Sequence, residues 1–192
     1  MEYAKLGNTD IEVSKLCVGC MSFGKAGTMH KWTLDEEQSG EVIRHALDLG
    51  INFFDTARFY TDSETKIGEA LGDVRENIYI ATKTAAQNSD DFWKDLNTSL
   101  NNLKTDYIDI YQFHNPSFCP QPGGEDGLYD AALKAKEQGK IRHISITNHR
   151  LTVAHQAIDS GLYETLQFPF SYLAGEQEME LVQKCREKNM GF

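Results

Sequence analysis

The sequence has 192 residues, of which 40% are apolar and 25% are charged, an ordinary composition for a single globular domain. Its net charge of −10 excludes the basic surface of a nucleic-acid-binding protein, and the absence of any run of about 18 apolar residues argues against a membrane partner. The N-terminus lacks an apolar signal core and the four cysteines are too scattered for a disulfide framework, so we expect a cytoplasmic protein.

Short apolar strands alternate with amphipathic helices along the chain. A hairpin is expected first, from residues 3–6 and 11–13 around the turn residues 7–10. The segments that follow are short and rich in β-branched or aromatic residues, which is typical of buried parallel strands. They span residues 16–18, 53–57, 78–83, 107–114, 141–147 and 165–170.

Helices are expected between these strands. The pattern Thr33-Leu-Asp-Glu36 resembles a capping box and predicts the start of a helix that ends at Gly50. Residues 63–71 predict a short helix before Gly72, and an apolar stripe predicts another after Ser89. Three more helices are expected over residues 127–138, 150–160 and 176–189.

Strand–helix alternation at this spacing predicts a parallel sheet with helical crossovers. No GxGxxG motif follows the first strand, which argues against an open dinucleotide-binding sheet. The alternative is a (β/α)8 barrel of the TIM type, which has eight units in roughly 250 residues. Six units are present here, and a seventh strand would begin at residues 189–192. We therefore expect residues 1–192 to form a single α/β barrel domain, truncated after about six units, with an N-terminal hairpin and open edges that favour self-association.

Polar side chains end three neighbouring strands. Asp55, Lys83 and His114 stand at these positions, and Tyr60 follows Asp55 by five residues on the next loop. In barrels of this type the chemistry lies at the C-terminal ends of the strands. A single aspartate at a strand end is more often a cap or turn residue, and a single lysine there usually extends its charged end into water. Four ionisable groups on one rim, however, indicate an active site.

The segment Asp55-Thr-Ala-Arg-Phe-Tyr60, followed by Glu64 and Ile-Gly-Glu-Ala-Leu71, resembles the signature of the aldo-keto reductase family. Three later segments resemble the same family: Ala81-Thr-Lys83, Asp106-Tyr-Ile-Asp-Ile-Tyr-Gln-Phe-His114-Asn-Pro116 and Gly139-Lys-Ile-Arg142. The resemblance covers essentially the whole chain. It implies a small-molecule carbonyl substrate, an aldehyde or ketone, that is reduced to an alcohol by hydride transfer from NADPH.

The resemblance implies a catalytic set of Asp55, Tyr60, Lys83 and His114, with no metal. Tyr60 would be the general acid, and the Lys83 ammonium would lower the pKa of its phenol. Asp55 would hold Lys83 in place. His114 would donate a hydrogen bond to the substrate oxygen.

The resemblance also implies residues for NADP(H). Thr147 and Asn148 stand where the family has a Ser-Asn pair that holds the nicotinamide carboxamide. Gln167 matches an amide on the family's sixth strand, and Met21 and Ser22 would border the ribose. The groups that bind the cofactor phosphates come mainly from the family's seventh and eighth units.

For two sets of residues the sequence allows two interpretations each. Aromatic residues on the rim loops either line an apolar substrate pocket or pack within the loops: Phe23, Trp32, Phe59 and Phe118. The Cys17-Val-Gly-Cys20 pair is either half of a redox or zinc site or, as we favour, part of the core.

Two other functions are compatible with parts of the pattern. Lys83 would also serve a barrel aldolase that forms a Schiff base, although that leaves Tyr60 and Asn148 without roles. A catalytically silent fragment that senses cofactor or partners is the second alternative.

Overall fold

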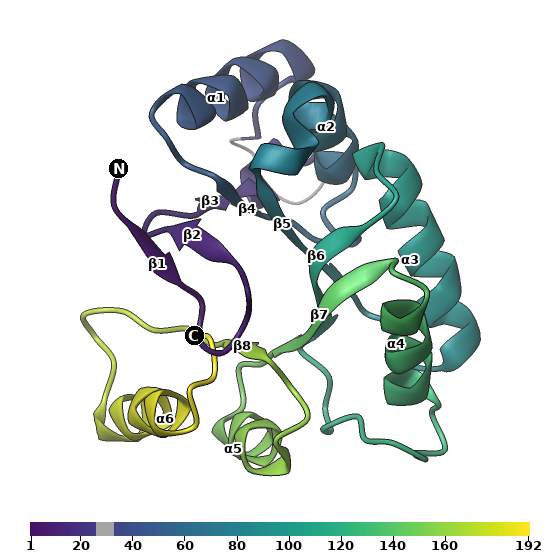
Figure 1. Ribbon diagram of the computed structural model, residues 1–192, viewed down its shortest axis with the longest axis vertical. Coiled ribbons are helices and arrows are strands. Elements are labelled where there is room, and N and C mark those ends of the chain that lie inside the picture. The colour runs from purple at the N-terminus through teal and green to yellow at the C-terminus, as the bar shows by residue number, and fades with distance from the viewer. Residues whose placement is uncertain (26–32) are drawn as a thin grey trace.

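Six parallel strands form one curved sheet in the computed structural model, which describes residues 1–25 and 33–192. The strand order is β3-β4-β5-β6-β7-β8, so each strand pairs with its neighbours in the sequence. The strands are β3 (Val18–Gly19), β4 (Phe53–Asp55), β5 (Tyr79–Thr84), β6 (Ile108–His114), β7 (Ile141–Thr147) and β8 (Thr165–Gln167). Sequential parallel pairing through helical crossovers is the pattern of a (β/α) barrel, and the sheet curls as part of one (Figure 1).

The helices surround the convex face of this sheet (Figure 1). They are α1 (Glu36–Asp48), α2 (Ser63–Leu71), α3 (Ser89–Leu103), α4 (Leu128–Glu137), α5 (Leu151–Ser160) and α6 (Glu176–Glu187), with 3-10 turns η1 (Cys20–Phe23) and η2 (Gly72–Asn77). Each strand is thus followed by a helix on the outer layer, which confirms the barrel architecture expected from the sequence. Among the helices of the described residues, none has the length and apolar character needed to cross a bilayer.

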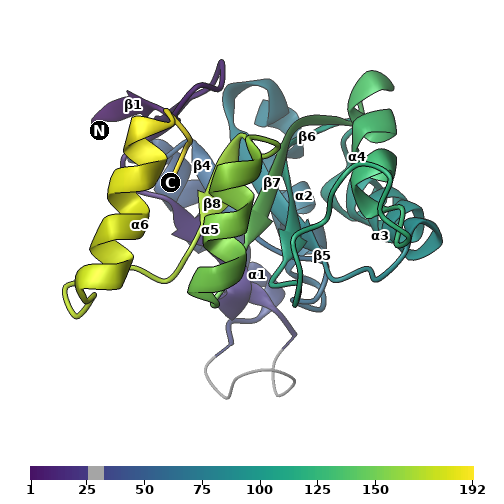
Figure 2. The same cartoon turned by 90° about the horizontal axis from the view of Figure 1, so that it is seen from below.

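An antiparallel hairpin of β1 (Tyr3–Lys5) and β2 (Glu12–Ser14) precedes the sheet, as expected. Its residues Ile11 and Val13 are buried against Ala81 and Ile110, which face the barrel interior. The hairpin therefore covers the end of the barrel at which the strands begin, and it lies at one end of the molecule in Figure 2. The opposite end, where the strands finish, is left for the rim loops.

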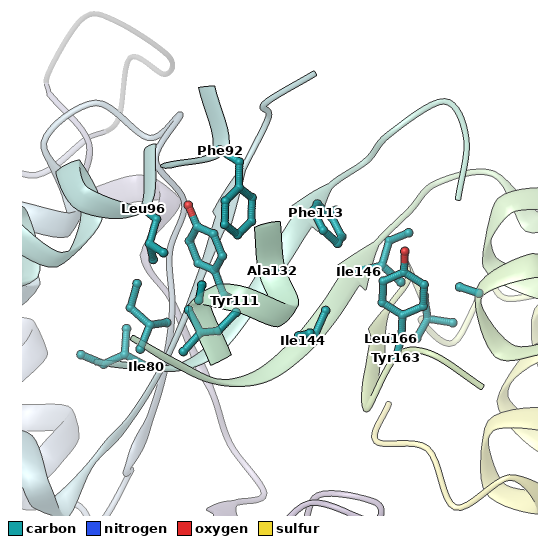
Figure 3. Close-up of a cluster of buried hydrophobic side chains, with 14 of the residues drawn as sticks. Ile80, Phe92, Leu96, Tyr111, Phe113, Ala132, Ile144, Ile146, Tyr163 and Leu166 are labelled. Atoms are coloured by element: carbon teal, nitrogen blue, oxygen red, sulfur yellow. The ribbon is translucent and has the colours of Figure 1, made fainter. Parts of the chain in front are cut away.

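The main core lies between the sheet and the helices. Phe92 of α3 is fully buried and meets Tyr111 of β6 edge to face, with ring centroids 5.4 Å apart. Figure 3 shows this aromatic pair among aliphatic side chains of β5, β7 and β8. Because every strand is anchored to the helices in this way, the strand ends form a fixed frame for polar side chains.

The element boundaries differ from the sequence prediction by up to three residues, and one cap was wrong. Helix α1 begins after Asp35, whose side chain accepts a hydrogen bond from the backbone N–H of Gln38. The Gln38 side-chain oxygen in turn accepts from the backbone N–H of Asp35. Thr33 is therefore not the cap. Both Thr33 and Asp35 are three residues ahead of a Glu or Gln, and Asp35 stands directly before the first residue with helical backbone geometry.

The sheet has two outer strands in the described chain, β3 and β8. Beyond β8, Gly191 makes a single parallel bridge with Thr165, and its carbonyl accepts from the backbone N–H of Leu166 at 2.8 Å. Gly191 thus pairs with β8 in the parallel sense, within residues 189–192, where the sequence analysis expected a seventh strand.

Candidate active site

The ends of β4 and β5 place an ion pair on the rim. Lys83 Nζ donates hydrogen bonds to Asp55 Oδ1 at 2.6 Å and to the carbonyl of Thr56 at 2.5 Å. Both side chains are largely removed from solvent, with 3% and 14% of their surfaces exposed. A pair in this setting is fixed in position, because breaking it would leave a buried charge without a partner.

A cavity of about 180 Å³ opens beside this pair. Its lining comes from the C-terminal ends of β5, β6, β7 and β8 and from the loops after β4, β7 and β8. The lining residues are Tyr60, Lys83, His114, Thr147, His149, Gln167, Phe168 and Pro169. The cavity therefore brings together five residues that the sequence pattern had assigned to one site, with Asp55 bound behind Lys83.

The Tyr60 ring lies between Lys83 and His114. Lys83 Nζ is 5.3 Å from the centroid of the ring, and the ring meets that of His114 edge to face at 5.9 Å. Burial raises the pKa of Tyr60 to about 12, and the negative charge of Asp55 adds to this effect. The expected lowering by Lys83 is not seen. The Lys83 ammonium is paired with Asp55, so little of its charge is left to stabilise a phenolate.

His114 is a neutral imidazole at neutral pH. Burial lowers its pKa to about 4, and the positive charges of Lys83 and His149 lower it further. A neutral ring carries one N–H, which is a hydrogen-bond donor without a net charge. Next to it, the Tyr60 phenol also holds its proton. The cavity thus offers two uncharged donors side by side.

Comparison with known proteins decides the family. A model of the aldo/keto reductase family matches residues 15–192. The chain belongs to this family. Aldo-keto reductase YhdN of Bacillus subtilis is 32% identical over 210 residues, covering 99% of this chain and 60% of that protein.

Solved structures agree with the fold. An aldo-keto reductase of Bacillus halodurans in its holo form is 28% identical, with a TM-score of 0.84 over 99% of this chain and 64% of its own. A Pseudomonas aeruginosa structure, at 22% identity, shares the fold with a TM-score of 0.86 over 98% of this chain and 75% of its own. The chain spans 56–64% of the length of three curated Bacillus subtilis relatives.

The loop of this aldo-keto reductase that carries Tyr60 is held on both sides. The Arg58 N–H donates to the carbonyl of Lys83 at 3.0 Å, and the Tyr60 N–H donates to that of Ala57 at 2.9 Å. Below the loop, the buried carboxylate of Glu64 accepts a hydrogen bond from Thr82 at 2.7 Å. The family signature thus contains the hydrogen-bonding groups that fix the loop to β5.

Two of the residues assigned to the cofactor line the cavity, namely Thr147 and Gln167. Asn148 is adjacent but fully buried. Its amide donates to the carbonyl of Pro116 at 2.8 Å and accepts from the backbone of Arg150 at 2.8 Å. The Asn148 side chain therefore holds the β6 and β7 loops together, and most of its hydrogen-bonding capacity is used.

The remaining sequence candidates lie away from this cavity. Met21 and Ser22 are in η1, after the end of β3. Of the rim aromatics, Phe23 is buried, Phe118 packs against the core and Phe59 is exposed, while Trp32 lies outside the described residues.

The Cys17–Cys20 pair does not form a metal site in the described structure. Cys20 is buried in the core and Cys17 is exposed. Among residues 1–25 and 33–192, no group of three or more potential ligands could hold a metal ion.

The sequence analysis missed three lining residues, His149, Phe168 and Pro169. His149 directly follows the pair Thr147-Asn148, and Phe168-Pro169 directly follow Gln167. Their positions next to expected site residues were the available signal. Adjacency in sequence gives no direction for a loop side chain, however, so the signal was weak.

Proposed function

We propose that this protein reduces aldehydes or ketones to alcohols with NADPH as hydride donor and Tyr60 as general acid. The single observation that supports this most is the convergence of Tyr60, His114 and the Lys83–Asp55 pair on one cavity. Carbonyl reduction needs a proton for the alkoxide that develops as hydride adds. Membership of the aldo-keto reductase family supports the same chemistry.

The cavity residues are compatible with a nicotinamide cofactor, which supplies the hydride when bound. Its carboxamide needs both a hydrogen-bond donor and an acceptor. The Thr147 hydroxyl accepts from the backbone of Asn115 at 3.1 Å and keeps its own proton to donate. The Gln167 amide offers both functions, although it also hydrogen-bonds Asp55. We assign these two residues to the carboxamide, with Asn148 fixing the loop beside them.

The proton has a short path in this proposal. A phenol with a pKa of about 12 is protonated at neutral pH, and it is still a stronger acid than an ordinary alcohol. Transfer from Tyr60 to the alkoxide is therefore favourable. The neutral His114 ring donates a hydrogen bond to the same substrate oxygen and orients it toward Tyr60.

The Schiff-base aldolase alternative is less compatible with the site. A lysine that attacks a carbonyl must lose its proton first, which desolvation or a second cation promotes. Lys83 instead donates to a carboxylate at 2.6 Å and to a backbone carbonyl. Both contacts stabilise the protonated amine.

Replacement of Tyr60 by Phe tests the proposal. We expect Tyr60→Phe to lose reduction of an aromatic aldehyde, followed as NADPH oxidation, by about a hundredfold or more, with NADPH affinity nearly unchanged. Tyr3→Phe is the matched control, since Tyr3 is exposed on the hairpin at the other end of the barrel. Equal turnover in Tyr60→Phe and the parent would remove Tyr60 from the mechanism.

A further inference from the structure

A second histidine shares the cavity with the proposed catalytic residues. His149 lies on the loop after β7 and lines the cavity together with Tyr60 and His114. It is exposed, and its positive charge is close enough to lower the pKa of His114. The proposed reduction gives it no role.

The backbone holds His149 at this position. Asn115 directly follows β6 and has a φ of 53°, a conformation that asparagine tolerates better than most residues. Its N–H donates to the carbonyl of Thr147 at 3.0 Å, and its side-chain oxygen accepts from the backbone of His149 at 3.2 Å and from Arg150 Nη1 at 3.1 Å. One asparagine therefore accepts hydrogen bonds from both basic residues of this loop, of which His149 lines the cavity.

The charges around the cavity are unbalanced. The groups that face His149 are His114 from β6, Lys83 and its partner Asp55, and Tyr60 from the loop after β4. No carboxylate is among the described residues that line the cavity, and Asp55 is already paired with the lining residue Lys83. In the part of the chain that the structure describes, neither His149 nor Arg150 forms an ion pair. A protonated His149 thus adds a positive charge that no described acid offsets.

We propose that His149, supported by Arg150, is a specificity-determining residue that selects carbonyl substrates bearing a carboxylate. The inference rests on the reductase function proposed above and names its substrate class. The carbonyl oxygen would meet Tyr60 and His114, and the carboxylate would lie toward the loop after β7. A cleft with one sign of charge concentrates ligands of the opposite sign, and a partly exposed charge pair changes affinity by about five- to tenfold.

The test compares two substrates that differ in charge, 4-carboxybenzaldehyde and its methyl ester. Their ratio of kcat/KM is measured for the parent, His149→Gln and His149→Lys at one pH. We expect the parent to prefer the acid. His149→Gln should lose about five- to tenfold of that preference, and His149→Lys should keep it. His155→Gln, a change on α5 outside the cavity lining, is the matched control and should behave as the parent.

A binding measurement separates this inference from the proposed activity. Dissociation constants of the acid and the ester are measured by calorimetry with the same variants. If the parent reduces neither aldehyde, the reductase proposal fails, and the binding preference still decides the role of His149. An equal preference for the acid in His149→Gln and the parent would overturn the inference. So would a loss of NADPH affinity in His149→Gln with the acid preference unchanged, because His149 would then bind a cofactor phosphate.

Discussion

His143 Nε2 of β7 lies 2.8 Å from a carboxylate oxygen of Asp10, in the turn of the N-terminal hairpin. The other ring nitrogen lies 2.6 Å from Glu164, which also accepts from Lys136 at 2.5 Å. The imidazole thus joins the hairpin to the sheet through two carboxylates from distant parts of the chain. The hairpin covers the closed end of the barrel, so this contact holds that cover in place.

The stability contributed by this contact should depend on pH. Burial lowers the pKa of His143, but Glu164 and Asp10 outweigh it and the net pKa is raised, so the stabilisation is complete below about pH 6.5 and is lost as pH rises through the raised value. Burial raises the pKa of Glu164, but His143 and Lys136 outweigh it and lower this pKa to about 2. The stabilisation that Glu164 contributes is therefore fully present above about pH 4.5 and is lost as the pH falls toward 2. The contact is therefore strongest between about pH 4.5 and 6.5.

We expect His143→Gln to lower the free energy of unfolding by on the order of 1–2 kcal/mol near pH 5.5 and by less near pH 9. Urea denaturation at the two pH values measures the difference. His45→Gln, which changes an exposed histidine on α1, serves as the control. A loss of stability that is the same at both pH values would mean that packing, and not charge, explains the effect.

Lys83 and Asp55 should shift the acid/base pKa of Tyr60 in opposite directions. Lys83→Met leaves the Asp55 carboxylate without its partner near the phenol, so we expect turnover to fall by about a hundredfold or more and the apparent pKa to rise. Asp55→Asn removes the negative charge that raises the pKa of Tyr60, so the apparent pKa should fall. The pH–rate profiles of both variants measure these shifts. An unchanged profile in Lys83→Met would exclude Lys83 from the acid/base step.

Gly68 sets the distance between α2 and α3. A Cβ atom at this position would lie 2.4 Å from the carbonyl oxygen of Asn102, so a side chain cannot be added without moving a backbone. We expect Gly68→Ala to cost about 1–3 kcal/mol and to lower Tm by several degrees. Gly40→Ala in α1 meets no neighbouring atom and should instead stabilise the protein by about 0.5–1 kcal/mol. Thermal unfolding of both variants compares them, and equal effects would contradict the close contact.

Much of this fold could be predicted from the sequence because local pattern and tertiary role coincide. The central strands β5 and β6 are buried on both faces, and the polar residues at their C-terminal ends, Lys83 and His114, follow from the strand direction alone. The predicted start of α1 was wrong because Thr33 and Asp35 both match the capping-box pattern. Only the backbone geometry of Asp35 decides between them.

The chemistry of the site was harder to predict than its members. The pKa of Tyr60 depends on burial and on how much of the Lys83 charge Asp55 neutralises, and neither quantity is encoded in spacing. The arrangement of two loops determines that the Asn148 amide donates a hydrogen bond to the carbonyl of Pro116. It also determines that His149 lines the cavity. Such contacts join residues about 30 positions apart, beyond the range of any local pattern.

The two outer strands of the sheet, β3 and β8, have edges that could pair with another chain. In the described chain β3 pairs only with β4, and β8 has a single bridge beyond it, so neither outer edge of the sheet is covered by a further strand. We propose that a polypeptide of these 192 residues alone self-associates through these edges, as the sequence analysis expected.

Sedimentation velocity over roughly a hundredfold range of concentration measures this association, and a lysine on the edge should weaken it, because charged edge residues oppose strand pairing. Gly19 of β3 suits that substitution, since a Cβ added there would meet no atom within 4 Å and its φ of −77° accepts any residue. Gly40→Lys, with equal space but on helix α1, is the matched control. We expect Gly19→Lys to shift the distribution toward monomer and Gly40→Lys to leave it unchanged. A parent that remains monomeric at every concentration, or two variants that respond alike, would show that the β3 edge does not mediate association.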